Sequence, residues 1–411
     1  MRKLVAALIC AAVVSVTVQA QDYNAQAKAI MERAELKRAF DYIDAHRDDI
    51  LNEWKTITEI NAPSGKEQPR AAFVKRLLET YKLDRVYSDT VGNVIAVRKG
   101  AGTGKPVVFD AHLDTVFQEG LKIKAEIRDG KIYAPGVGDD TRNVEALLAA
   151  IRAMNEAGVK TQSDLLFVFT VAEETSFGGA KHFIQENKER IGQYVALDGG
   201  YQGLTYGGIG INWYKFHFIG PGGHTRSKTP PYSASLPLAR AISRIYQLEL
   251  PQQPDVNLNI GMLGGAEVVN AKAADAWFTV DLRSTDQKAI DDFEKRITDI
   301  CREEAERAGF QLKVEDVEEK LPAAQLPGNR ESFGVRMGEA VHRAMGFENV
   351  TVSPTGSNNS NVALLAGLNA FSTGAGPCGG DHSLGEWCEI EPYYRGVKKT
   401  ILLAAALAGI Q

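Results

Sequence analysis

The segment PVVFDAH at residues 106–112 is a mostly apolar run that closes on a histidine. Two more apolar runs follow it, LLFVFT at 165–170 and YVAL at 194–197, and residues 142–157 and 179–187 have helical periodicity. Near-continuous apolar strands that alternate with helices are typical of a sheet covered by helices on both faces. The sequence therefore predicts an α/β fold with a mixed, mostly parallel sheet, and functional side chains are expected where its strands end.

The residues before this segment favour helices followed by a short pair of strands. Apolar residues have helical spacing over 25–60 and 67–81, and the sequence NAPSG at 61–65 interrupts them. Short strands are expected at 85–87 and 94–97. These elements extend the same domain toward its amino end.

A different order of elements begins after about residue 210. It is strand, helix, two strands, helix and strand, at 213–219, 233–247, 256–262, 274–282, 287–308 and 312–318. This order is that of the split βαβ, ferredoxin-like arrangement. We therefore predict an inserted ferredoxin-like α+β domain within the α/β domain.

The chain returns to the first domain after this insert. Residues 321–328 have the composition of a linker, and a helix at 332–345 and an apolar run at 362–368 follow. The predicted organisation is a signal peptide at 1–20, the α/β domain at 21–211 and 323–411, and the inserted domain at 212–322.

The first twenty residues have the features of a secretory signal peptide. Arg2 and Lys3 precede an apolar run, and Val18-Gln19-Ala20 is a small-residue cleavage pattern. The run from Leu4 to Val18 is shorter than the ~20 residues of a membrane-spanning helix. We therefore expect a periplasmic or secreted protein that has no membrane anchor after cleavage.

Composition narrows the class of function. Hydrophobic residues make up 44% and charged residues 24% of the 411 residues, which is ordinary for a globular protein. Removal of Arg2 and Lys3 with the signal peptide leaves 45 basic against 52 acidic side chains, a net charge of −7. An acidic chain does not favour nucleic acid as a partner.

Three cysteines remain outside the signal peptide, Cys301, Cys378 and Cys388. They are too few for a disulfide scaffold and lack the spacing of a cysteine zinc module, so a metal site in this chain would consist of histidines and carboxylates. In an oxidising compartment, a disulfide between Cys378 and Cys388 would close a short loop around His382.

His112 and Asp114 mark the end of the first apolar strand. Side chains two residues apart in a strand point to the same face. Asp114 is therefore placed to orient His112 and to leave one ring nitrogen free for a metal. The alternative is a histidine that is satisfied by a local hydrogen bond.

Two pairs of acids occupy neighbouring loops. Asp139-Asp140 precedes the helix at 142–157, where capping explains Asp140 but leaves Asp139 free to bridge two cations. Glu173-Glu174 follows the strand at 165–170. Neighbouring carboxylates repel each other, so a metal bound by one would leave the other free as a base. The alternative for this second pair is a solvated loop.

Asp198 and His382 complete the set of strand-end and loop motifs. Asp198 follows the strand at 194–197 in the sequence DGG, for which a simple Asp-Gly turn is the alternative, and His382 lies in a glycine-rich loop. Two histidines and several carboxylates are ligands that zinc accepts. Together the five motifs predict a metal site.

These motifs resemble those of the co-catalytic zinc exopeptidases and amidohydrolases, which include peptidase T, carboxypeptidase G and the aminoacylases. The order His-x-Asp, Gly-x-x-Asp-Asp, Glu-Glu, Asp, His spans nearly the whole mature chain, and GGAKHF at 178–183 is most similar to peptidase T-like proteins. The resemblance implies two Zn²⁺ ions, with Co²⁺ or Mn²⁺ as substitutes. It implies Asp139 as the bridge, His112 and Asp198 on one metal, and Glu174 and His382 on the other.

The resemblance also implies that the domain at 21–211 and 323–411 is catalytic and that the insert at 212–322 is a lid or dimerisation domain. It implies further roles beside the metals. Glu173 becomes the general base, Asp114 orients His112, and a cis peptide bond joins Asp139 to Asp140. His224, in the sequence GPGGHT at 220–225 of the lid, becomes a donor to the reaction oxyanion.

Substrate-binding residues are implied in the lid and near the end of the chain. They are Asn270 in GGAEVVN at 264–270, Arg283 in DLR at 281–283, and Asn361. A turn residue and an ion pair with Asp281 are the plain alternatives for Asn270 and Arg283. Departures from the family pattern, Thr141-Arg142 and Asn359, lie close to the expected substrate.

The sequence thus predicts an exported di-zinc peptidase that acts on short peptides, as an aminopeptidase or tripeptidase, with a homodimer formed through the lid. The enzymatic alternative is a carboxypeptidase or an N-acyl-amino-acid amidohydrolase, in which the metals and the base would be the same. The non-enzymatic alternative is a secreted binding protein of the same fold.

Overall fold

The computed structural model describes residues 22–102, 104–265 and 268–411. The expected signal peptide at 1–20 lies outside these residues, as do Ala266 and Glu267 of the expected lid motif. In the described part of the chain, no helix is both long and apolar enough to cross a membrane.

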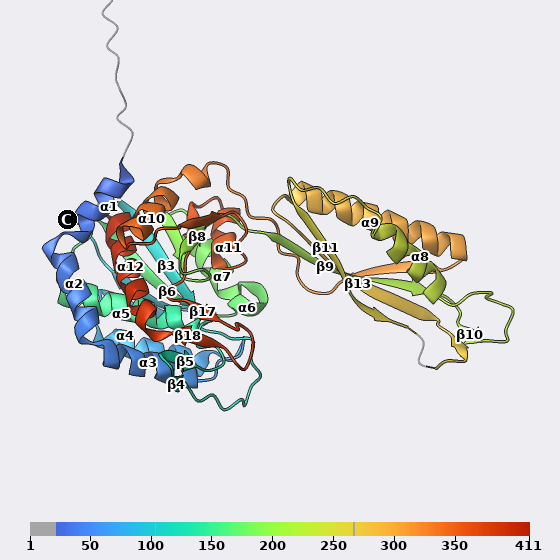
Figure 1. Ribbon diagram of the computed structural model, residues 1–411, viewed down its shortest axis with the longest axis horizontal. Helices are drawn as coiled ribbons and strands as arrows, with labels where there is room; N and C mark the ends of the chain where they lie inside the picture. Colours follow the sequence, from blue (N-terminus) through green and yellow to red (C-terminus); the bar gives the residue numbers. More distant parts are fainter. Residues whose placement is uncertain (1–21, 103, 266–267) are drawn as a thin grey trace, which may run out of the picture.

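Eight strands of the described chain form a central mixed sheet (Figure 1). Their spatial order is β1 (Arg85–Ser88), β2 (Val94–Arg98), β6 (Ser163–Thr170), β3 (Gly104–His112), β7 (Gln193–Ala196), β16 (Ala370–Ser372), β8 (Gly203–Thr205) and β15 (Thr351–Ser353). The middle strands β6, β3, β7 and β16 are parallel, whereas β1 and β2 run antiparallel at one edge. The predicted α/β class is confirmed.

Helices cover both faces of this sheet because its inner strands are apolar on both sides. One face, which includes Phe109 and Phe167, packs against α1 (Tyr23–Met31), α2 (Ala34–Ala45), α3 (Arg47–Glu59), α4 (Gln68–Thr80), α5 (Thr141–Glu156), α10 (Phe333–Ala344) and α12 (Ile390–Ala408). The other face, which includes Val108 and Val168, packs against α7 (Gly178–Asn187) and α11 (Asn359–Leu365).

Two features of this domain differ from the sequence-based expectation. The helical region expected at 25–60 consists of three helices, α1 to α3. The sequence analysis also made no assignment for α12, which is buried along most of its length. Its run of leucines and alanines is apolar on all sides, so it has no amphipathic period that would mark it as a helix.

A second lobe contains the insert (Figure 1). Strands β9 (Gly210–Ile219), β11 (Val256–Gly264), β13 (Asp275–Ser284) and β14 (Gln311–Asp316) form an antiparallel sheet in the order β11-β13-β9-β14. The helices α8 (Ser235–Ile245) and α9 (Gln287–Ala308) pack on it and close a separate hydrophobic core. This is the ferredoxin-like arrangement expected from the order of elements.

Smaller elements complete the chain. In the lid, β10 (Gly223–His224) and β12 (Ala271–Lys272) form a small two-stranded antiparallel sheet. A four-stranded sheet combines β17 (Cys378–Gly379), β18 (Trp387–Glu389), β5 (Lys131–Tyr133) and β4 (Glu126–Arg128). The short helix α6 (Glu173–Ser176) follows β6, and the 3-10 helix η1 (Asn329–Glu331) precedes α10.

Candidate metal centre and active site

The central strands deliver polar side chains to one edge of the sheet. His112 is the last residue of β3, Glu173 follows β6 by three residues, and Asp198 follows β7 by two. These three strands are parallel neighbours, so their carboxyl ends lie at the same edge. Asp139 joins them from the loop that precedes α5.

Asp139 lies between the two histidines expected as metal ligands. Its Oδ1 is 2.9 Å from His112 Nε2, and its Oδ2 is 3.1 Å from His382 Nε2. The peptide bond between Asp139 and Asp140 is cis, as the resemblance implied. One carboxylate that presents a different oxygen to each histidine has the geometry needed to bridge two metal ions.

Two groups of potential ligand atoms share Asp139. The first combines His112, Asp139, Asp140 and Asp198, and the second combines Asp139, Glu174 and His382, with the atoms of each group within 4.8 Å of one another. In the second group, His382 Nε2 is 3.2 Å from Glu174 Oε2. The five residues expected to bind metal are therefore brought together, and Asp140 is an additional member.

Asp140 has other hydrogen bonds that explain its position. Its Oδ2 accepts from the backbone N–H of His112 at 2.9 Å, and its Oδ1 accepts from Asn143 Nδ2 at 2.5 Å. With both oxygens engaged, Asp140 fixes the backbone of His112 rather than offering a free ligand atom. Asn143, which the sequence analysis did not single out, takes part in this support.

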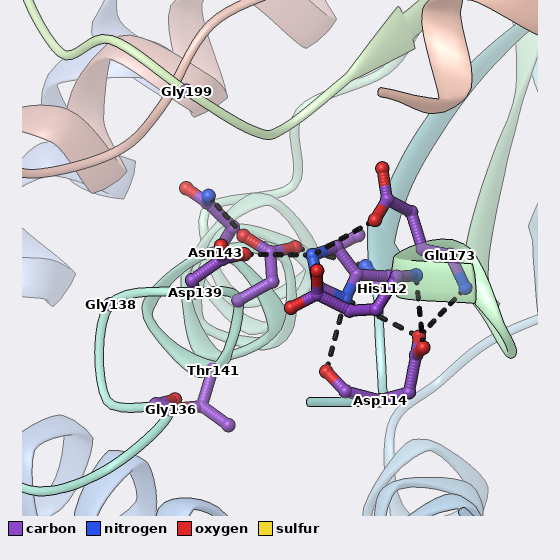
Figure 2. A network of polar contacts seen from close by, with 12 residues as sticks. His112, Asp114, Gly136, Gly138, Asp139, Thr141, Asn143, Glu173 and Gly199 are labelled. Atoms are coloured by element: carbon purple, nitrogen blue, oxygen red, sulfur yellow. Dashed lines mark hydrogen bonds and ion pairs between the residues drawn. The ribbon is translucent and has the colours of Figure 1, made fainter. Parts of the chain in front are cut away.

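Asp114 organises the other side of His112 (Figure 2). Its Oδ1 lies 3.4 Å from His112 Nδ1 and accepts the backbone N–H of Glu173 at 2.9 Å. Its Oδ2 accepts from Glu174 N at 3.1 Å and from Ser64 Oγ at 2.6 Å. Asp114 thus couples the orientation of His112 to the start of α6, where both glutamates lie. The contact of Ser64 with Asp114 was not predicted, because the sequence showed only that Ser64 lies in a turn.

The carboxylate of Glu173 lies beside the metal-ligand cluster. It is 6% exposed, and its Oε2 is 3.9 Å from His112 Nε2. Its side chain makes no hydrogen bond to any residue that the structure describes. Burial raises the pKa of Glu173 well above its usual value. A buried carboxylate with a raised pKa and no partner is suited to accept a proton.

The cluster as a whole fits a cation. Burial raises the pKa of Glu174 to about 7 and that of Asp198 to about 6, because a carboxylate loses hydration inside the protein. Glu174 Oε1 is buried and has no hydrogen-bond partner among the described residues. Convergent carboxylates with an orphaned buried oxygen, together with two imidazoles, form a donor set suited to divalent metals.

Glu386 supports the loop that carries Asp139, and the sequence analysis gave it no role. Its fully buried carboxylate accepts three backbone N–H groups, from Gly136 at 2.8 Å, Gly138 at 2.6 Å and Asp139 at 2.7 Å. Burial raises the pKa of Glu386 to about 7. Three successive donors to one carboxylate define the shape of this loop.

A disulfide joins Cys378 to Cys388, with the Cα atoms 4.0 Å apart. The two residues are paired across β17 and β18. The loop between them contains His382, whose φ is 62°, and Glu386. The disulfide that the sequence left open is therefore present, and it closes the loop that presents both side chains.

Within the described residues, the lid residues expected at the active site form no hydrogen bond or ion pair with this cluster. His224 is exposed and belongs to β10, which is at the end of the lid farthest from the central sheet (Figure 1). The carbonyl of Asn270, which precedes β12, accepts from Thr225 N, which follows β10, at 3.0 Å. Arg283 forms a two-pronged ion pair with Asp281, Nε to Oδ1 at 2.9 Å and Nη2 to Oδ2 at 3.0 Å. Substrate contacts by Asn270 and Arg283 stay predictions.

Asn361 has a structural role in this conformation, and its contact with substrate stays a prediction. It is 0% exposed, its Nδ2 donates to Gly356 O at 3.1 Å, and its Oδ1 accepts Asn358 N at 3.4 Å. These bonds cap the amino end of α11. Asn359 is also buried and donates to Asp110 Oδ2 at 2.6 Å, so it supports the sheet from below the site.

Comparison with known proteins places this centre in a family. The profile of peptidase family M20/M25/M40 matches residues 108–406, which include all five expected metal ligands and Glu173. The chain belongs to this family. Members of the M20 family are hydrolases that act on peptides.

Curated relatives of this M20 chain match it over part of their length. Carboxypeptidase G2 of Pseudomonas sp. (strain RS-16) is 29% identical over 138 residues, 32% of this chain and 33% of the relative. A peptidase M20 domain-containing protein of Schizosaccharomyces pombe is 27% identical over 246 residues, 57% and 60% of the two chains. The aligned part therefore spans between a third and three fifths of these relatives.

Solved M20-like structures share the fold over nearly their whole length. Aminopeptidase PepT from Bacillus cereus has a TM-score of 0.77 at 19% identity and covers 88% of this chain and 99% of its own. A tripeptidase from Staphylococcus aureus has a TM-score of 0.76 at 23% identity, with 88% and 98% covered. The YXEP protein of Bacillus subtilis, described as a dinuclear metal-binding peptidase of the M20 family, has a TM-score of 0.68 at 14% identity, with 89% and 99% covered.

Proposed function

We propose that this protein is an exported dinuclear zinc aminopeptidase that hydrolyses di- and tripeptides. The observation that carries the proposal is the position of Asp139, which presents one oxygen to each of two histidines. The carboxylate of Glu173 lies beside them, 3.9 Å from His112 Nε2. Family membership supports peptide hydrolysis in general, and the finer statements are ours.

Five residues would hold the two metal ions. Asp139 would bridge them, with His112 and Asp198 completing one site and Glu174 and His382 the other. We propose Zn²⁺ because it accepts mixed histidine and carboxylate ligands, and Co²⁺ or Mn²⁺ would substitute. Two such ions, when bound, lower the pKa of a water molecule and polarise the scissile carbonyl.

Glu173 is the proton carrier in this proposal. It accepts a proton from the attacking water and delivers it to the leaving amine, which requires a carboxylate near the metals that does not bind them. Asp114 supports this role by holding the backbone N–H of Glu173 at 2.9 Å, which fixes where the side chain begins.

A small cavity supports recognition of the amino end of the substrate. It measures about 140 Å³, is bordered by Glu173 and Glu174, and has Phe177, Trp213, Glu318 and Glu319 among its walls. Its apolar surface suits one side chain, and its carboxylates suit an ammonium group. The solved aminopeptidase and tripeptidase of the same fold also favour recognition of the amino end.

Recognition of the amino end of the peptide can be tested directly. The metal-loaded protein is assayed with a free tripeptide, its N-acetylated form and its C-terminally amidated form. We expect N-acetylation to abolish cleavage, because it removes the ammonium charge. Equal rates for free and N-acetylated substrates would overturn the aminopeptidase assignment and favour the amidohydrolase alternative.

The reaction itself is tested by two neighbouring substitutions. Glu173→Gln removes the proton acceptor and is expected to lower kcat by roughly 10²- to 10⁴-fold with metal content unchanged. Glu174→Gln, the matched control, is expected to lose metal because it removes a ligand. Elemental analysis beside kinetics distinguishes the two. Full activity in Glu173→Gln would exclude it as the base, and a wild-type protein that turns over no peptide would favour the binding-protein alternative.

We further propose that a homodimer formed through the lid supplies His224 to the partner's active site. The position of β10 far from the central sheet argues against a contact within one chain. Strand β11 is at the edge of the lid sheet and exposes Met262 by 56% and Leu263 by 61%, so it is available for pairing with a second lid.

Export is proposed from the signal-peptide pattern of residues 1–20. The disulfide between Cys378 and Cys388 supports an oxidising compartment, because structural disulfides are rare in reducing ones. Amino-terminal sequencing of the protein recovered from the periplasm or medium is expected to begin near Gln21. Recovery of an intact amino terminus from the cytoplasm would contradict the proposal.

A further inference from the structure

Arg142 is a buried cation at the edge of the metal-ligand cluster. It is the second residue of α5, three residues after Asp139, and is 7% exposed. Its Nη2 donates to the carbonyl of Gly199 at 2.6 Å, so the side chain reaches the residue that follows Asp198. The guanidinium therefore lies next to residues from both sides of the first metal site.

This guanidinium has few partners for its charge. Its Nε is buried without a hydrogen-bond partner among the described residues. Among these residues, the side chain makes one hydrogen bond, from Nη2 to the carbonyl of Gly199. Within the described ranges, no carboxylate oxygen lies within 4.0 Å of its nitrogens. An arginine has five N–H donors arranged for a planar anion, and a buried cation is costly unless it is paired.

The charge of Arg142 favours the ionised forms of Asp139 and Asp198, but neither acid forms an ion pair with it within the described residues. Asp139 already directs its oxygens toward His112 and His382, and bound metals would take up the charge of Asp139 and Asp198. With both metal ions in place, the surroundings of Arg142 become more positive rather than less. An anion from outside the chain is the remaining partner.

A large cavity gives that anion a place. It measures about 590 Å³ and is bordered by Asp139, Arg142 and Asp198, by the glycine-containing segment 199–205, and by Thr351 and Ser353. Arg142 is the one arginine or lysine among its lining residues in the part of the chain that the structure describes. The space is several times that of the cavity beside Glu173 and has room for more than one residue of a peptide.

We propose that Arg142 is a specificity-determining residue that binds a carboxylate of the substrate within this cavity. This inference rests on the proposed peptidase function but does not depend on which bond is cleaved. In a di- or tripeptide, the carboxylate is the free carboxyl terminus or an acidic side chain on the same side of the scissile bond. Recognition of the terminus would explain a restriction to short peptides, because a longer chain would place its carboxylate beyond the reach of Arg142.

The test compares matched substrates on the metal-loaded enzyme. Trialanine is compared with its C-terminal amide, and Ala-Glu-Ala-amide with Ala-Gln-Ala-amide. We expect wild-type kcat/KM to favour one carboxylate form by roughly 10- to 100-fold, the range of a charge-assisted two-pronged hydrogen bond. The first pair reports on the terminus and the second on a side chain, so the preferred pair identifies the source of the carboxylate.

Variants of Arg142 separate recognition from structural support. Arg142→Gln is expected to reduce the preference to about one, and Arg142→Lys to keep part of it, because lysine retains the charge without the planar fork. Arg190→Gln, which removes an exposed arginine elsewhere, serves as the control and leaves the ratio unchanged. A purely structural role would lower the rates for both members of a pair together and leave their ratio intact.

A binding measurement keeps this inference independent of turnover. Calorimetric affinities for trialanine and its amide are measured in metal-loaded Glu173→Gln, with and without Arg142→Gln. If the wild type cleaves no peptide but Arg142→Gln removes a preference for the acid, the proposed reaction fails and the carboxylate site stands. The absence of any preference in the wild type, or its persistence in both Arg142 variants, would overturn the assignment.

Discussion

Replacement of Glu386 by glutamine tests whether the metal site depends on the loop that holds Asp139. The buried carboxylate accepts three backbone N–H groups, from Gly136, Gly138 and Asp139. A glutamine can keep its carbonyl oxygen at the position that serves Gly138 and Asp139. Its amide group would then face the N–H of Gly136, so two donors would oppose each other without an acceptor.

The structure sets the size of the effect. One buried N–H loses its acceptor, at about 1–3 kcal/mol, and two charge-assisted bonds become neutral ones, each weaker by roughly 1 kcal/mol. These costs overlap, and we expect a loss of about 3 kcal/mol in the free energy of unfolding. Because Asp139 is the shared ligand, loosening its loop is expected to weaken metal binding by roughly 10- to 100-fold, the usual effect of removing a group that orients a ligand.

The assay is a competition titration with a chromophoric chelator at pH 8, above the pKa of about 7 at which Glu386 ionises. Thermal unfolding of the metal-free protein measures the stability term separately. Glu348→Gln, which neutralises an exposed glutamate, is the matched control. Wild-type metal affinity in Glu386→Gln, with the loss confined to stability, would refute the link between this loop and the metals.

Three further predictions concern the surrounding structure. Cys378→Ser removes the disulfide that closes the loop of His382, and it is expected to lower the free energy of unfolding by roughly 2–3 kcal/mol through loop entropy. Bound metal should fall toward one ion per chain, and two tightly bound ions in the variant would contradict this prediction. In metal-free protein, the pKa values of Glu174 and Asp198 are about 7 and about 6, above the values of ~4.3 and ~3.9 in the unfolded chain. The native state therefore binds more protons than the unfolded state, so Tm should fall from pH 5 to pH 8. A Tm that rises over this range in chelator-treated protein would contradict the prediction. Mixing His224→Ala with Glu173→Gln should restore activity if His224 acts across a dimer, and no recovery after proven subunit exchange would argue for action within one chain.

Local sequence patterns were sufficient to predict much of the fold. The apolar runs that became β3, β6 and β7 are buried on both faces, so their composition reported their environment directly. The lid was predictable because its helices are amphipathic and its order of elements has few possible arrangements. Helix α9 also has local end signals, with the Asp286 side chain accepting Ala289 N and Gly309 in the left-handed region at its end.

Other elements depend on distant partners and left little local trace. Helix α12 is buried by packing against α5 and α10, and its second half, residues 401–408, consists of isoleucine, leucine and alanine without a polar face. Strands β17 and β18 are two and three residues long and are defined by pairing with each other and with β5. Short pairings of this kind acquire their stability from neighbours that lie far along the chain.

The sequence by itself pointed to the side chains of the candidate metal site, because His112, Glu173 and Asp198 end or follow buried strands and the family resemblance added the loop residues Asp139 and His382. It did not determine how those side chains are held. The support of Asp139 by Glu386 spans 247 residues, and the contact of Arg142 with Gly199 spans 57. Asn361, which the resemblance implied as a substrate-binding residue, is buried and accepts a hydrogen bond from the backbone of Asn358. Hydrogen-bond partners that are distant in sequence are chosen by the packing of whole elements, so only the tertiary structure decides them.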